Sequence, residues 1–181
     1  NHFEGYEAGT TNSTSSNIFA LGYQAGKLNT AANGHFAGYQ AGTNNSTGTP
    51  NMFIGYQSGY NNTTGNQNTS LGYQALYTNS IGNYNLAVGY LAGYNNVADS
   101  NTFIGWNAGY NTSGGGQNVF VGFKSGFSCT SGRKNISVGC ENISGGTATG
   151  GENSLIGYHA GAGITSGNGN YGPCLRSGKP V

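Results

Sequence analysis

A glycine followed by an aromatic side chain recurs along this chain at an almost constant spacing. Ten such glycines, here called the repeat glycines, are separated by 17, 16, 17, 17, 17, 16, 17, 17 and 18 residues, and the next residue is aromatic after nine of them. They are Gly5, Gly22, Gly38, Gly55, Gly72, Gly89, Gly105, Gly122, Gly139 and Gly157. A short fixed period is the sequence signature of a solenoid, in which each coil buries its apolar face only against the next coil.

The residues around each repeat glycine alternate in character. In the most complete copy, residues 51–60 read Asn-Met-Phe-Ile-Gly-Tyr-Gln-Ser-Gly-Tyr. An apolar residue precedes the glycine in nine of the ten units, and an aromatic, a mostly polar and a small residue follow it. Alternation with a period of two is typical of a β-strand with one buried face. The sequence therefore predicts an all-β chain that forms a parallel β-solenoid (a β-helix or β-roll) of about ten coils of 16–18 residues.

Three columns of this repeat are candidates for ladders along the stack. The aromatic residues after the repeat glycines are predicted to form a structural core ladder, with sugar stacking as the functional alternative: Tyr6, Tyr23, Tyr39, Tyr56, Tyr73, Tyr90, Trp106, Phe123 and Tyr158. A second aromatic column lies four residues further on, as a possible edge, ligand or interface column: Tyr60, Tyr77, Tyr94, Tyr110 and Phe127. Asparagines at the start of the units, such as Asn51 and Asn68, are expected to hydrogen-bond along the stack.

The repeat motif divides the chain into a β-solenoid domain, residues 1–163, and a non-repeat C-terminal tail, residues 164–181, which is expected to cap the solenoid or to contact another subunit. Glu4 and Glu7 lie in the first coil, whereas Arg176 and Lys179 lie in the tail. Head-to-tail stacking of an acidic first coil on a basic tail would give an open filament. A plain disordered tail is the alternative.

Composition excludes several classes of function. Only 6% of the residues are charged and the net charge is +1, so the chain has no basic stripe for nucleic acid and too few acids for calcium-binding repeats. No apolar run is long enough for membrane insertion. The chain contains 35 glycines, but its 12% aromatic content argues against disorder.

Catalytic and metal-binding patterns are missing. The three histidines share no metal-ligand spacing, and the few acids form no suitable carboxylate pair. We therefore expect no enzyme activity, no metal and no cofactor. Cys129 and Cys174 are a possible disulfide within or between chains, and Cys140 is expected to be a buried thiol that replaces an aromatic residue.

The unit from Asn51 to Gly65, Asn-Met-Phe-Ile-Gly-Tyr-Gln-Ser-Gly-Tyr-Asn-Asn-Thr-Thr-Gly, resembles the repeats of bacterial and phage tail-fibre-domain proteins. More distantly, it is similar to the head repeats of trimeric autotransporter adhesins. The resemblance covers about residues 1–161. It implies a parallel β-helix or β-roll, commonly a homotrimer, on an extracellular, cell-surface or virion fibre.

Together these observations favour a structural subunit of an extracellular or virion fibre or filament, whose main partner is itself, as a head-to-tail filament or a homotrimer. The first alternative is a surface adhesin that contacts glycans. An ice-binding solenoid is a further alternative, which needs threonines at one fixed column; the threonines that we compared, such as Thr43, Thr78 and Thr112, occupy different columns.

Overall fold

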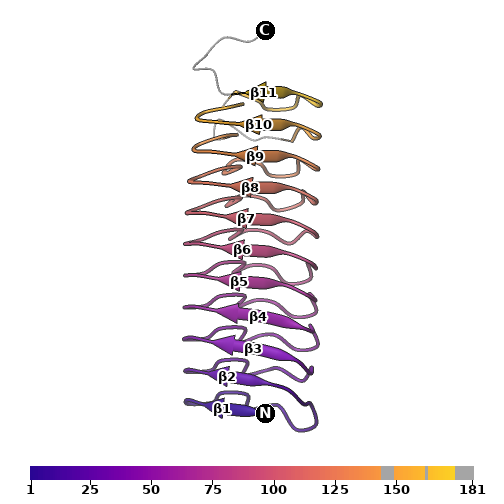
Figure 1. Cartoon of the computed structure of the whole chain (residues 1–181). Helices are drawn as coiled ribbons and strands as arrows, with labels where there is room; N and C mark the ends of the chain where they lie inside the picture. The colour runs from indigo at the N-terminus through magenta and orange to yellow at the C-terminus, as the bar shows by residue number, and fades with distance from the viewer. Residues whose placement is uncertain (144–148, 162, 174–181) are drawn as a thin grey trace.

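The computed structural model describes residues 1–143, 149–161 and 163–173, and these form a rod of stacked coils (Figure 1). Each coil contributes one short strand to a single parallel sheet of eleven strands, in which sequence neighbours are spatial neighbours from β1 to β11. The predicted all-β parallel β-solenoid is confirmed. The described residues contain no helix long and apolar enough to cross a membrane.

The strands are three or four residues long and stack in register, as in the pairing of Phe53 with Phe36 and with Ser70. Their bounds are β1 (His2–Glu4), β2 (Phe19–Leu21), β3 (Gly34–Ala37), β4 (Asn51–Ile54), β5 (Thr69–Leu71), β6 (Leu86–Val88), β7 (Thr102–Ile104), β8 (Val119–Val121), β9 (Ile136–Val138), β10 (Ser154–Ile156) and β11 (Tyr171–Pro173).

Each of strands β1 to β10 ends at the residue before the repeat glycine, so the predicted strand through the glycine is wrong. The segment from the glycine onward is a turn, in which Gly55 has φ 127° and Gln57 has φ 50°. Glycine is required here for two reasons. Positive φ strains residues that carry a Cβ, and a Cβ on Gly55 would lie 2.4 Å from the carbonyl oxygen of Gly72 in the next coil. The repeat glycines therefore let neighbouring coils approach along one edge.

The position of the strand end also shows that the residues predicted to face inward face outward, and that those predicted to face outward face inward. The residue immediately before the repeat glycine, such as Leu71 or Ile104, is exposed or half-buried. The residue before that one points inward and forms what we call the core column. Its buried members are Ala20, Phe36, Phe53, Ser70, Ala87, Phe103, Phe120, Ser137 and Leu155.

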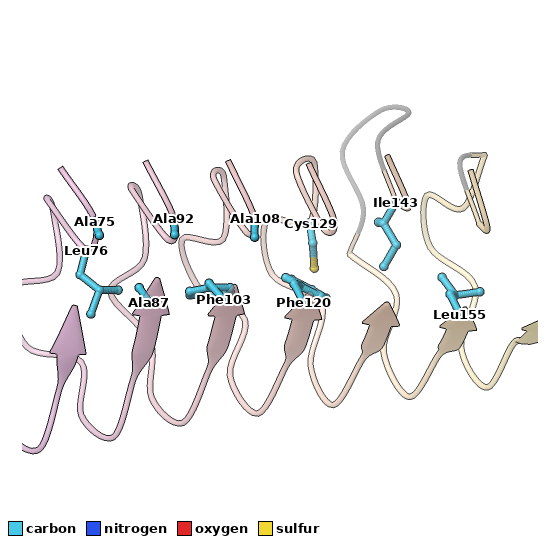
Figure 2. Packing of buried hydrophobic residues seen from close by; sticks show 10 residues of the cluster. All are labelled: Ala75, Leu76, Ala87, Ala92, Phe103, Ala108, Phe120, Cys129, Ile143 and Leu155. Carbon is cyan, nitrogen blue, oxygen red and sulfur yellow. The ribbon is translucent and has the colours of Figure 1, made fainter. Parts of the chain in front are cut away.

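The core column packs against small residues on the opposite wall of each coil. Figure 2 shows Phe103 and Phe120 on their strands, facing a wall that carries Ala92, Ala108 and Cys129. The two phenyl rings are 5.9 Å apart and tilted by 35°. Where Ser70 stands in the core column, the facing position of the preceding coil is Ser58, and the two hydroxyls hydrogen-bond to each other. A hydroxyl in the core column is thus paired with a hydroxyl of the adjacent coil.

Buried asparagines hold the coils together, and the predicted asparagine ladder is confirmed. The backbone N–H of Asn68 donates to Oδ1 of Asn51 over 2.8 Å, and that of Asn85 donates to Oδ1 of Asn68 over 3.0 Å. We call this the leading Asn column; its buried members are Asn51, Asn68, Asn85, Asn101, Asn118, Asn135 and Asn153. A second buried amide column, absent from our sequence prediction, contains Asn29, Asn45, Asn62, Asn79 and Asn96. A buried amide is destabilising unless it has hydrogen-bond partners. The hydrogen bonds of these two columns therefore make it possible for the interior to contain so many asparagines.

An eleventh strand corrects the predicted domain boundary at residue 163. Strand β11 pairs with β10, and the backbone N–H of Asn170 donates to Oδ1 of Asn153 over 3.0 Å. No repeat glycine follows β11 in the sequence, so the glycine spacing does not indicate this strand. The spacing of 17 residues from Asn153 to Asn170 was the available signal. Cys174, Arg176 and Lys179 lie outside the described residues.

Candidate functional surface

The residues after the repeat glycines form a continuous stack, here called the first aromatic ladder. From Tyr6 to Phe123, successive ring centroids are 4.9–6.0 Å apart and the ring planes differ by 5–15°. The one-coil repeat sets this spacing, because equivalent residues of stacked parallel strands are about 4.8 Å apart. Cys140 interrupts the ladder between Phe123 and Tyr158.

The first aromatic ladder is not part of the core, which corrects the prediction. Its members range from 39% exposed at Tyr23 to 66% exposed at Tyr6, and include Trp106 at 41%. The turn that follows each strand places these rings outside the coil, while the core column fills the interior. Water can therefore reach the phenolic hydroxyls, which would otherwise need buried partners.

The second aromatic column also forms a stack, the second aromatic ladder. Its ring centroids from Tyr60 to Phe127 are 5.1–5.3 Å apart, with interplanar angles of 3–13°. All five members are half-buried. Burial, together with the neighbouring phenols of Tyr77 and Tyr110, raises the pKa of Tyr94. The prediction that this column lies at an accessible edge is consistent with its partial exposure.

An amide column, which runs from Gln24 to Gln74, follows the first ladder in the turns. Gln40 donates from Nε2 to Oε1 of Gln24, and Gln57 donates in the same way to Gln40, each over 2.8 Å. Lys124 occupies the same column further along, where its Nζ lies 5.3 Å from the ring of Phe123 and 5.8 Å from that of Phe127. These contacts place the amide column between the two aromatic ladders.

The stacking restricts what the ladders can bind. Each interior ring has a neighbouring ring against both faces, so the ring edges and hydroxyls face solvent and the faces do not. A sugar that stacks on an aromatic side chain needs a free face. The geometry therefore argues against sugar stacking along the interior of either ladder.

The outer face of the sheet is largely apolar, with His35, Thr69, Thr102 and Ser154 as its polar members. Strands β2 to β10 contain no Asp, Glu, Lys or Arg. In the sequence, each strand is followed by the repeat glycine and then by the residue at the position of the first aromatic ladder. Large apolar side chains on this face are more than one third exposed: Leu21, Met52, Leu71, Ile104, Val119, Ile136, Val138 and Ile156. We call these columns, together with the first aromatic ladder, the outer sheet face. It is unusual, because monomeric soluble proteins rarely expose contiguous apolar patches beyond a few hundred Å².

The residues proposed for end-to-end assembly are only partly described. Nζ of Lys27 donates to Oε2 of Glu7 over 2.6 Å, and this hydrogen bond lowers the pKa of Glu7. Glu7 is therefore already paired with the second coil, whereas the exposed Glu4 lies 3.5 Å from His2. Because Arg176 and Lys179 lie outside the described residues, their pairing with the first coil stays a prediction.

The cysteines have different environments. Cys129 is buried in line with the second amide column, and burial raises the pKa of its thiol to about 11. Cys140 is half-buried where it interrupts the first aromatic ladder, so the prediction of a buried thiol is wrong. The disulfide between Cys129 and Cys174 stays untested, because Cys174 lies outside the described residues.

Within the described ranges, no three His, Cys, Asp or Glu side chains come together as metal ligands. Comparisons with protein-family models, with curated proteins and with solved structures found no match. The structure thus establishes a β-solenoid repeat protein, and its function has to be argued from its surface.

Proposed function

We propose that this chain is a structural subunit of an extracellular or virion fibre, which assembles with other copies of itself through the outer sheet face. The single observation that supports this most is the absence of any Asp, Glu, Lys or Arg from nine consecutive strands whose outward side chains are largely apolar. The resemblance of the repeat unit to tail-fibre-domain proteins points in the same direction.

The size of the outer sheet face suits a specific contact. Nine coils at about 4.8 Å each, with three columns about 7 Å apart, give on the order of 600 Å² per chain. Two such faces would bury about 1,200 Å², which is the lower end of the standard range for specific interfaces. A second copy offers the same coil spacing, so each column can meet a matching column at every coil.

The alternative functions have weaker support. A glycan-binding adhesin would have to contact sugars through ring edges, hydroxyls and amides, since the interior ring faces are covered. An ice-binding solenoid needs free hydroxyls in a regular array. Here a Ser/Thr column does exist, but Thr30, Ser46 and Thr63 each donate their hydroxyl to a backbone carbonyl of the next coil.

The test is the mass of the chain in solution, measured by sedimentation or light scattering over a range of concentrations. We expect an oligomer whose mass falls to that of the monomer when Leu71 and Ile104 are both replaced by Lys. The control is Ile81→Lys, which changes an even more exposed apolar residue outside the strands and should leave the oligomer intact. Circular dichroism checks that each variant folds. A wild-type chain that stays monomeric at high concentration would refute the proposal.

A further inference from the structure

Unbroken runs of stacked tyrosines are the most unusual chemical feature of the surface. Six consecutive tyrosines begin the first aromatic ladder, and four begin the second. In the first run the neighbouring centroids are 5.3, 5.0, 5.1, 4.9 and 5.1 Å apart. These six rings are exposed by at least 39%. Phenols are therefore held close together in a position that solvent and small reagents can reach.

We infer that these runs are sites of oxidative cross-linking, at which tyrosines of adjacent coils are joined as dityrosine. A one-electron oxidant of the peroxidase or metal-complex class removes one electron from each of two phenols, and each phenol releases its hydroxyl proton to water. The two phenoxyl radicals form a carbon–carbon bond between their ortho positions. Loss of the two ortho hydrogens to the oxygens restores both phenols. Overall, two tyrosines lose two electrons and two protons, and the oxidant takes up the two electrons.

The ladder favours this reaction because it supplies the proximity that dilute tyrosines lack. Holding two reactants side by side turns a bimolecular step into an intramolecular one, with a large gain in effective concentration. Electron transfer between rings in contact also lets a radical formed anywhere in the run move next to a second one. Tyr84 provides the contrast, since it is a 59% exposed tyrosine that belongs to neither ladder.

The product would tie coils together along the rod. A bond between Tyr39 and Tyr56, for example, joins residues 17 apart and closes one complete coil. Both partners lie in one chain, so the inference does not rest on the proposed function. Assembly through the outer sheet face would cover the first aromatic ladder, so the cross-linking belongs to the free chain.

The experiment is photo-oxidation of the intact chain with tris-bipyridyl ruthenium(II) and persulfate at low protein concentration. We expect dityrosine fluorescence in a species that keeps the monomer mass on a denaturing gel, with a yield per chain independent of protein concentration. Peptide mass spectrometry should locate the bonds between adjacent ladder residues, such as Tyr39 with Tyr56 and Tyr56 with Tyr73.

The decisive variant combines Tyr23→Phe, Tyr56→Phe and Tyr90→Phe. It keeps the stacked rings but leaves no two neighbouring phenols in the first ladder, so its cross-links in that ladder should fall by about tenfold or more. The second ladder of the same molecule serves as an internal reference. Tyr84→Phe also removes an exposed phenol and should leave the yield unchanged. The inference is overturned if the main product is a dimer of chains whose yield rises with concentration, or if the triple variant cross-links the first ladder as well as the wild type does.

Discussion

At the scale of single residues, Leu76 and Ile143 show how the coil compensates for a missing phenyl ring. Both replace the glycine that stands four residues after the repeat glycine, and both keep its positive φ, 52° and 50°. In the preceding coil a Cβ on Gly59 would lie 2.5 Å from Cγ of Phe53. The coils of Leu76 and Ile143 carry Ser70 and Ser137 in the core column instead. The larger side chain fills the space that the absent ring leaves.

This compensation predicts the effect of Leu76→Gly. The change relieves about 1–2 kcal/mol of left-handed strain but removes a fully buried side chain, whose loss costs about 2–5 kcal/mol. We expect net destabilisation of about 1–3 kcal/mol, measured as a lower urea midpoint. Leu91→Gly is the control, because Leu91 has a similar φ of 54° but is half-exposed, and it should stay within about 1 kcal/mol of the wild type. A Leu76→Gly chain as stable as the wild type would contradict the argument.

At the scale of elements, the leading Asn column stabilises the sheet from inside. Nδ2 of Asn118 donates to the carbonyl oxygens of Gly132 and of the Asn101 side chain, while its Oδ1 accepts the backbone N–H of Asn135. Each amide thus uses its donor and its acceptor at once. A side chain with only acceptors cannot replace it without facing a carbonyl oxygen.

Asn118→Asp should therefore destabilise the fold by about 3 kcal/mol at neutral pH, because it buries a carboxylate against carbonyl oxygens. Burial and these oxygens raise the pKa of the new carboxyl in the folded state above its unfolded value. The folded state then binds the proton more tightly, so the defect is smallest below about pH 4 and grows as the pH rises. Urea titrations of wild type and variant between pH 3 and 7 test this. Asn17→Asp, at an exposed asparagine, should show little of either effect.

The sequence was sufficient to predict the coil, its period and the asparagine ladder, because each follows from residues that recur at one spacing. It was not sufficient to predict which columns face inward. An alternating pattern shows that every second residue shares one face, but it does not show which of the two faces is buried. In addition, the strand ends before the repeat glycine instead of passing through it. One signal was available: Phe53 has no hydroxyl and is buried, whereas Tyr56 carries one and is exposed. The pairing of Ser58 with Ser70 depends on contacts between coils, which no single unit displays.

At the scale of the whole molecule, the strand order from β1 to β11 means that each strand pairs only with the strands of adjacent coils. Stability in such an array is close to a sum of coil and neighbour terms. A complete coil can then be removed if the new junction restores the register and brings equivalent residues together.

Deletion of residues 106–122 meets both conditions. It removes 17 residues, joins Gly105 to Phe123, and leaves Phe103 in the place of Phe120. We expect a folded rod that is shorter by about 4.8 Å and slightly less stable, measured by small-angle X-ray scattering and circular dichroism. Deletion of residues 106–113 provides the contrast, because it breaks the register and should unfold several coils. If both deletions behave alike, the coils are not the independent units that the fold implies.

The backbone hydrogen bonds between coils also determine how the rod responds to force. They run along its long axis, from Gly55 to Ala37 and from Gly72 to Ile54 over 2.8 Å each, so a pull on the chain ends loads them one coil at a time. Such peeling needs little force, since few bonds break at each step. A rod that must carry mechanical load therefore benefits from any link that crosses several coils, and side-by-side contact with a parallel neighbour is one way to provide it.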